Sequence, residues 1–164
     1  MGKNETADLQ IPPRAAIEPM ADLGRDGCAE IANHLRPLLA DVFAQYLKTK
    51  NFHWHLSGVR FRDYHLLLDE HADQIFAMTD DIAERARRIG ETTLRSLGHI
   101  GRHQRLKDND REALSPKEML SELRADKREL TRFLRLAHEV CEDNDDVATA
   151  SLIENWIDQT ERRT

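Results

Sequence analysis

Apolar residues recur at helical spacing in four long segments of the chain. One segment runs from about Asp26 to His55, and the next runs from about Arg62 to Ile89, with apolar residues at alternating steps of four and three. A third covers residues 115–141, and a fourth begins at Val147. These steps keep apolar side chains on one helix face, whereas a strand would place them at every second residue. The pattern predicts an all-α fold built as a bundle of four main helices.

Helix-breaking residues mark where the first two helices end. Ser57 and Gly58 follow the first segment, and Gly90 follows the second; glycine is typical of the position just after a helix. Pro37 is different, because it falls inside the first segment. A proline in a helix interior removes one hydrogen bond and costs about 3 kcal/mol. We therefore expect a kink or a restart of the helix at Pro37.

The start of the third helix has a strong signal. Ser115 can cap the helix, Pro116 suits its first position, and Glu118 stands where a capping box places an acid.

The connection before this helix, residues 91–114, is mixed in character. We expect at most one short helix there, around Thr92–Leu97, which Gly98 and Gly101 would interrupt. The bundle therefore has a short extra helix in its central connection.

The first 22 residues differ from the rest of the chain. They hold three of the five prolines and few large apolar groups, which predicts an extended or mobile N-terminal tail. Residues 23–164 then form one domain, since a chain of 164 residues that is 40% hydrophobic can bury a core of its own.

The net charge and the cysteines limit which partners and which cellular location are expected. The net charge of −6 argues against simple attraction to nucleic acid or anionic lipid and favours cations as partners. Cys28 and Cys141 lie far apart and have no metal-binding spacing. The chain has neither the apolar core of an export signal nor the ~18 apolar residues of a membrane span. We expect a cytoplasmic protein with no membrane partner.

Two pairs of ionisable residues on the second predicted helix could bind a metal ion. His65 with Asp69, and Asp80 with Glu84, are spaced four residues apart and so share a helix face. The 11 residues from Asp69 to Asp80 return to nearly the same face but rise ~16 Å along the helix axis. One copy of the helix therefore cannot close a single site around both pairs.

A second copy of the helix could complete the site. The two pairs are related by reversal about the midpoint between residues 74 and 75. Two antiparallel copies around a twofold axis would place His65 near Glu84 of the other subunit, and Asp69 near its Asp80. A solvated, salt-bridged face explains such pairs equally well in a chain that is 33% charged.

Two more histidines stand near the end of the preceding helix, in "NFHWHLSG". A tight turn at Ser57 and Gly58 could fold this helix back, so that a histidine joins the same face. His53 and His55 point about 200° apart on a helix, so only one of them can serve easily. Spacing alone does not choose between them.

The stretch "KTKNFHWHLSGVRFRDYHLLLDEHADQIFAMTDDIAERARRIG" resembles the Dps family, the mini-ferritins that protect DNA in starved cells. The resemblance covers residues 48–90 by motif and about 26–160 by helix layout. The ordered set H-x(11)-H-x(3)-D-x(10)-D-x(3)-E is similar to the family's ferroxidase ligands. The resemblance implies a ferritin-like four-helix bundle and a hollow shell of twelve subunits. It also implies the ligands of one metal site, which are His53, His65, Asp69, Asp80 and Glu84. Asp80 and Glu84 would come from the twofold-related subunit.

The resemblance also implies the chemistry. Family members oxidise Fe(II) to Fe(III) with hydrogen peroxide, or with dioxygen, and store ferric mineral in the cavity. A mixed set of imidazole and carboxylate ligands suits iron better than a closed cysteine site does. Trp54 beside a ligand is a candidate for absorbing stray oxidising equivalents, although plain packing explains it equally well. Asp73 lies on the same helix face and could help to bind a second iron ion. The simpler interpretation is that its carboxylate is only exposed to solvent.

Two further features bear on iron entry and on DNA. The acidic run before the last helix is a candidate lining for a threefold pore, as in the family, through Asp143, Asp145 and Asp146, although such a run is more often a solvated turn. Family members with lysine-rich tails use them to contact phosphates, whereas residues 1–22 hold Lys3 and Arg14 among four acids.

DNA binding is therefore doubtful, and association with the nucleoid stays a secondary expectation. Residues 85–107 hold seven Lys or Arg against a single acid, Glu91. We expect internal salt bridges there rather than an external patch. The alternatives to a ferroxidase are a non-catalytic protein that coats DNA and a structural helical oligomer whose matched residues are inactive or hold zinc.

Overall fold

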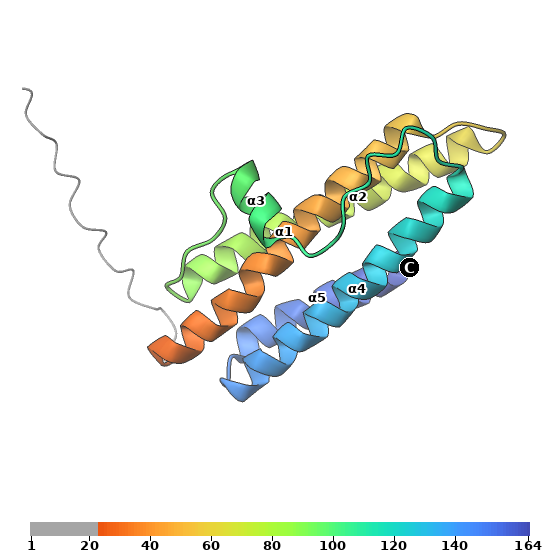
Figure 1. Ribbon diagram of the computed structural model, residues 1–164. Coiled ribbons are helices and arrows are strands. Elements are labelled where there is room, and N and C mark those ends of the chain that lie inside the picture. Colours follow the sequence, from red (N-terminus) through yellow and green to blue (C-terminus); the bar gives the residue numbers. More distant parts are fainter. Residues whose placement is uncertain (1–22) are drawn as a thin grey trace, which may run out of the picture.

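The computed structural model describes residues 23–164, so the predicted N-terminal tail lies outside the described residues. Figure 1 shows that these residues form four long helices and one short one, and no strand occurs among them. The helices are α1 (Arg25–His55), α2 (Phe61–Arg88), α3 (Leu97–His103), α4 (Pro116–Asp143) and α5 (Val147–Arg162). The all-α prediction, with its short extra helix in the central connection, is confirmed.

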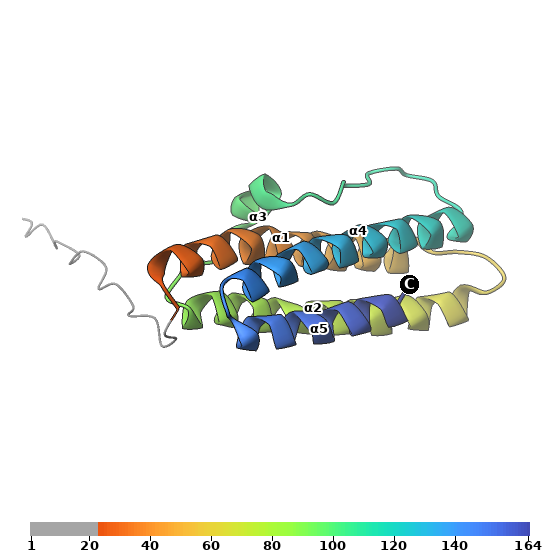
Figure 2. The ribbon, with the colours of Figure 1, turned by 90° about the horizontal axis from the view of Figure 1, so that it is seen from below.

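The four long helices form two layers. In Figure 2, α1 and α4 lie in one layer and α2 and α5 in the other, while α3 lies on the outside of the α1–α4 layer. The end of α1 packs against the start of α4, because Phe52 shares a buried cluster with Met119 and Leu123. The helices α1 and α2 have the most extensive contact in the bundle. Any site between α1 and α2 therefore stands on a rigid base.

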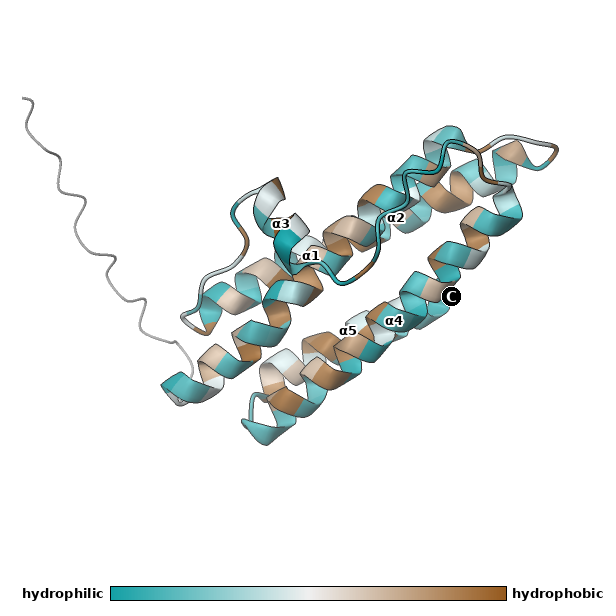
Figure 3. Cartoon of the chain, in the orientation of Figure 1, coloured by the Kyte–Doolittle hydropathy of each residue, from teal (hydrophilic) through white to brown (hydrophobic). Residues whose placement is uncertain are grey.

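Apolar side chains fill the space between the layers. A large cluster centred on residues such as Leu35, Ile82, Leu134 and Trp156 holds one end of the bundle, and a smaller cluster around Phe52 holds the other. Figure 3 shows hydrophobic stripes along the long helices, with hydrophilic residues on the opposite faces. No helix in the described part of the chain has an apolar stretch long enough to span a lipid bilayer.

Helix α1 passes through Pro37 without a break, so of the two expected outcomes, a kink or a restart, the restart is wrong. Leu35, Leu38 and Leu39, on either side of the proline, are all buried. Their packing against the other helices outweighs the hydrogen bond that the proline removes.

The ends of α1 and α2 agree with the glycine signals. Gly58 has a φ of 111° and Gly90 a φ of 86°, a left-handed conformation that glycine adopts without steric cost. The capping box at Ser115 and Glu118 is also present.

The short helix differs from its prediction. It covers Leu97–His103 rather than Thr92–Leu97, and it contains both glycines that were expected to interrupt it. The side-chain oxygen of Ser96 accepts a hydrogen bond from the His99 N–H and so caps the helix one position before Leu97. The carbonyl oxygen of Thr92 instead accepts a hydrogen bond from Arg36, which holds the preceding segment against α1.

A buried carboxylate fixes the connection between α3 and α4. Asp41 is fully buried on α1 and accepts hydrogen bonds from the main-chain N–H groups of Arg105 and Leu106. The Arg105 guanidinium lies 2.7 Å from the same carboxylate and stacks over the ring of Phe133. The long connection is therefore anchored to both helices of one layer.

Candidate metal centre

His53 at the end of α1 and His65 in the first turns of α2 face each other. The Nδ1 atom of His53 lies 2.9 Å from the main-chain oxygen of His65, and the Nδ1 of His65 lies 3.1 Å from the main-chain oxygen of His53. Their rings stack with centroids 3.6 Å apart. The short turn at Gly58 brings these two histidines together from neighbouring helices.

This reciprocal pair determines which ring atom is free to bind a metal. A carbonyl oxygen can only accept a hydrogen bond, so each Nδ1 must carry the proton and donate. The Nε2 atom of each neutral ring then keeps its lone pair, as metal-binding histidines require. Nε2 of His53 lies 3.8 Å from the Asp69 carboxylate.

Asp69 is held by a residue that sequence reasoning missed. The Lys50 ammonium lies 2.6 Å from the Asp69 carboxylate. This hydrogen bond is the main cause that lowers the pKa of Asp69, with smaller contributions from the two imidazoles, and it raises the pKa of Lys50. The carboxylate is therefore ionised, as a metal ligand must be, and an incoming cation would have to displace Lys50.

The structure also distinguishes the two histidines that flank Trp54. His53 is buried and lies beside His65 and Asp69. His55 is exposed, and its Nδ1 hydrogen-bonds to the main-chain oxygen of Asn51, one turn back on α1. Only His53 belongs to the cluster.

Asp80 and Glu84 form a separate half on the same helix. Both are exposed on α2, and Glu84 forms an ion pair with Arg88. Within residues 23–164 of one subunit, no three His, Cys, Asp or Glu side chains lie close enough together to hold a metal ion. A single subunit thus presents two separate groups of candidate ligands, as the spacing along α2 predicts.

Several side chains near the candidate ligands are exposed to solvent. Trp54 is 59% exposed and Phe76 is 50% exposed, so neither is buried in the core of the subunit. Asp73 is exposed and acts on Lys50 through its charge. Large exposed apolar residues beside these candidate ligands point to a surface that another molecule covers.

The acids before α5 do not all have the same environment. Asp146 is buried, pairs with Arg85 at 2.7 Å and caps α5 through Thr149. Its carboxylate is therefore occupied inside the subunit and is not available to line a pore. Asp143 and Asp145 are exposed, and their place in a pore stays a prediction.

Three of the seven basic residues at 85–107 form ion pairs within the subunit. Arg85 binds Asp146, Arg88 binds Glu84, and Arg105 binds Asp41. The expectation of internal salt bridges therefore holds for these three residues. Arg95 and Arg102 are exposed and form no ion pair with any residue in the described range.

Comparisons with known proteins agree with the fold. Residues 32–164 match the family described as the ferritin-like domain. A low temperature-induced protein of Nostoc is 33% identical over 105 residues, which are 64% of this chain and 59% of that protein. The DNA protection during starvation protein of Helicobacter pylori is 26% identical over 128 residues, 78% of this chain and 87% of that protein.

A solved structure extends the match to nearly the whole chain. The Dps homologue of Halobacterium salinarum superposes with a TM-score of 0.85 at 26% identity, covering 94% of this chain and 88% of that one. The aligned region is less than two thirds of the Nostoc protein but most of the other two relatives. The chain belongs to the ferritin-like family and, within it, to the Dps proteins.

Proposed function

We propose that this protein is an iron-storing mini-ferritin that oxidises Fe(II) with hydrogen peroxide, or with dioxygen, and so protects the cell against oxidative damage. The observation that supports this most is the reciprocal pair of His53 and His65, because it uses both Nδ1 atoms and leaves the Nε2 lone pair of each neutral ring free, with the Nε2 of His53 3.8 Å from the ionised Asp69. Imidazole and carboxylate together suit Fe(II) and its oxidised product.

The site is closed by a second subunit. His53, His65 and Asp69 come from one copy, and Asp80 and Glu84 come from the twofold-related copy. The separation of the two half-sets along α2 supports this division. Each dimer then contains two equivalent sites.

The redox balance needs no further cofactor. Two Fe(II) ions each give up one electron, the O–O bond of one peroxide breaks, and two protons complete two water molecules. Because both electrons reach the same peroxide, no hydroxyl radical is released. The carboxylates favour the Fe(III) product, since Fe(III) is the harder ion.

Storage requires a closed assembly. A shell of twelve copies would enclose the mineral, and exposed acids such as Asp143 and Asp145 would attract Fe(II) to its openings. DNA coating is the alternative function. The ion pairs that occupy Arg85, Arg88 and Arg105 within the subunit disfavour it.

Iron oxidation tests the proposal directly. Fe(II) is added anaerobically and pulsed with peroxide, and ferric absorbance is followed. The double variant His65→Ala/Asp69→Ala should slow the fast phase by at least about tenfold, while His55→Ala, the neighbouring exposed histidine, serves as the matched control. An unchanged fast phase in the double variant would refute the proposal. Tightly held zinc without ferric mineral would favour the structural alternative.

A further inference from the structure

The short helix α3 carries a second pair of histidines, outside the candidate metal centre. His99 and His103 are spaced four residues apart and therefore share one face of the helix. Their ring centroids lie 4.7 Å apart, with the ring planes at 62° to each other. Two imidazoles that bind one ion at ~2.0–2.1 Å each need their nitrogens about 3 Å apart, and rings this close can provide that spacing.

The ring nitrogens of this pair have no other use within the subunit. His71 lies 3.1 Å from the Lys127 ammonium, and His138 pairs with two glutamates. Within residues 23–164, by contrast, no hydrogen bond or ion pair engages a ring nitrogen of His99 or His103. A neutral imidazole keeps one unprotonated nitrogen. The pair therefore offers two lone pairs to one external ion.

Both ends of α3 are fixed, so the pair is held in place before an ion arrives. At the start, the side-chain oxygen of Ser96 accepts a hydrogen bond from the main-chain N–H of His99 at 3.1 Å. Just after the helix, Asp41 accepts hydrogen bonds from the main-chain N–H groups of Arg105 and Leu106. Ligands on a fixed element lose less conformational freedom when they bind.

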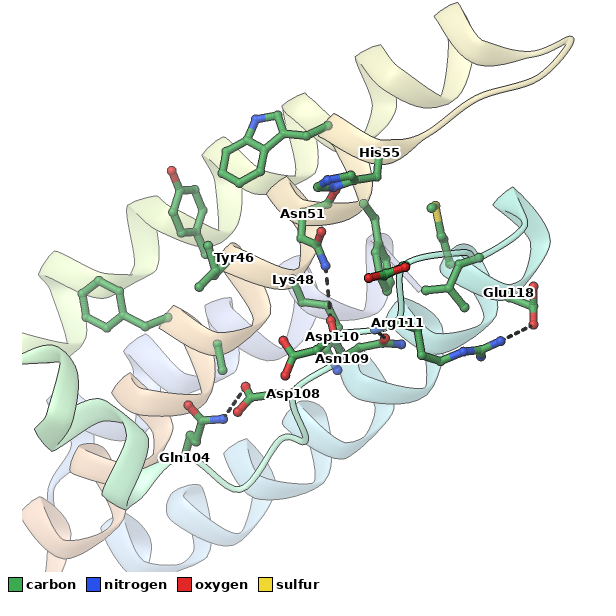
Figure 4. A pocket seen from close by; sticks show the side chains of 18 of the residues that line it. Tyr46, Lys48, Asn51, His55, Gln104, Asp108, Asn109, Asp110, Arg111 and Glu118 are labelled. Carbon is green, nitrogen blue, oxygen red and sulfur yellow. Dashed lines mark hydrogen bonds and ion pairs between the residues drawn. The ribbon is translucent and has the colours of Figure 1, made fainter.

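The pair lies on a different side of α3 from a large groove. This groove has a volume of about 1460 Å³ and runs between α1 and the segment from α3 to the start of α4. Figure 4 shows Tyr46 on its α1 side, with Gln104 and Asp108 on the connection. The α3 residues that line it are Leu97, Ile100, Gly101 and Gln104. His99 and His103 are not among them, so a molecule that covers the groove leaves the pair open to solvent.

The charges around the pair select the class of ion. The charged groups that act most on His99, besides His103, are Arg102, Arg36 and Arg95. Such surroundings disfavour ions that bind mainly through carboxylates and other oxygen ligands, such as Mg(II), Ca(II) and Mn(II). Imidazole nitrogen suits Cu(II), Ni(II) and Zn(II), and affinity at a nitrogen site is highest for Cu(II).

We propose that His99 and His103 together bind one imidazole-preferring divalent ion, with Cu(II) favoured over Zn(II) and water in the remaining coordination positions. Two histidines four residues apart on a helix also bind zinc in the H-E-x-x-H motif. Ile100 stands where that motif has its glutamate, so the pair binds an ion without a general base beside it. The site gives the protein a second metal specificity and does not depend on the proposed function.

Copper titration tests the site in a protein whose candidate iron ligands are removed. The background is His65→Ala/Asp69→Ala, and His99→Gln/His103→Gln is added to it. Glutamine is polar and favours helix, so α3 should persist, and circular dichroism checks the fold. The control is His55→Gln, since His55 is an exposed histidine outside α3. Cu(II) is added to at most one equivalent per subunit, so that the tightest site fills first.

Electron paramagnetic resonance of the bound Cu(II) counts its nitrogen ligands. We expect a two-nitrogen pattern in the background protein and in the His55→Gln control. The double glutamine variant should bind Cu(II) at least about tenfold more weakly, and His99→Gln or His103→Gln alone should leave one nitrogen. Unchanged affinity and an unchanged nitrogen pattern in the double glutamine variant would overturn the proposal.

Two further measurements test the class of ion and the separation from iron. Mn(II) should stay unbound at concentrations at which Cu(II) saturates the pair, and Mn(II) bound as tightly as Cu(II) would contradict the assigned class. In a protein with His65 and Asp69 intact, His99→Gln/His103→Gln should oxidise Fe(II) as fast as wild type. Loss of iron oxidation in that variant would overturn the assignment of a separate site.

Discussion

His53 and His65 each donate a hydrogen bond from Nδ1 to the main-chain oxygen of the other, at 2.9 and 3.1 Å. Because both acceptors are main-chain oxygens, the backbone alone determines that each neutral ring carries its proton on Nδ1. It also ties the last turn of α1 to the first turns of α2. The same contacts that close the turn therefore orient the two nitrogens that we propose as ligands.

Lys50 should limit the affinity of the site for divalent cations. Its ammonium occupies the Asp69 carboxylate, so Lys50→Met removes a competitor and a repelling charge while Asp69 stays ionised at neutral pH. We expect roughly two- to fivefold tighter binding of Co(II), used as a spectroscopic substitute for Fe(II). Lys107→Met, which removes an exposed lysine on the connection, is the control. Unchanged or weaker binding by Lys50→Met would show that Lys50 does not compete with the metal.

Asp41 should be the most important polar residue for the central connection. Asp41→Ala leaves the main-chain N–H groups of Arg105 and Leu106 without their acceptor and removes the partner of the Arg105 guanidinium. We expect a loss of about 3 kcal/mol in the free energy of unfolding, measured by urea denaturation. Glu118→Ala, at the exposed start of α4, should cost less. Equal losses in the two variants would argue against the anchoring role of Asp41.

Lys127 should make stability rise with pH just above neutrality. It is 4% exposed, and burial lowers its pKa from 10.5 to about 8. The unfolded chain therefore binds more protons than the folded one between about pH 8 and 10.5, so stability is lowest below pH 8 and increases through this window.

The clearest window is pH 8 to 9, because burial raises the pKa of Cys141 from 9.0 to about 12, which opposes the gain above pH 9. Over this unit of pH, the Lys127 contribution should reach about 1 kcal/mol. Lys127→Met should remove it, as measured by urea denaturation at both pH values. A variant with the same pH dependence as wild type would assign the effect to other groups.

Much of the fold could be predicted because it depends on local signals. Apolar periodicity, Ser115 and Gly58 act within a few residues of where they stand. Helix α3 was misplaced because the Ser96 cap competes with two glycines, and the cap prevails once Thr92 is held by Arg36. The restart expected as one outcome at Pro37 does not occur for a similar reason, since the packing that sustains α1 comes from other helices.

Some residues of the candidate site could also be predicted from local spacing, whereas others depend on how the helices pack. The i,i+4 pairs on α2 were visible because both members lie on one helix. The choice between His53 and His55 needed the direction of the turn, which depends on α2 packing against α1. Lys50 could not be found, because its partner Asp69 is 19 residues away on another helix and nothing in the spacing links them.

Mixing two inactive variants tests the shared site most directly. One variant carries His65→Ala/Asp69→Ala and the other carries Asp80→Ala/Glu84→Ala, so each lacks a different half of the ligand set. A mixed dimer then contains one intact site and one that lacks both halves. Subunits are dissociated, mixed in equal amounts and reassembled, and the rate of peroxide-driven Fe(II) oxidation is compared with that of each variant alone.

The account predicts that each variant alone is inactive and that the mixture regains about a quarter of the wild-type rate, because half of randomly paired dimers are mixed and each of these has one working site. Native mass spectrometry confirms that mixed dimers have formed. Mixed dimers without any regained activity would contradict the claim that two subunits share the metal centre.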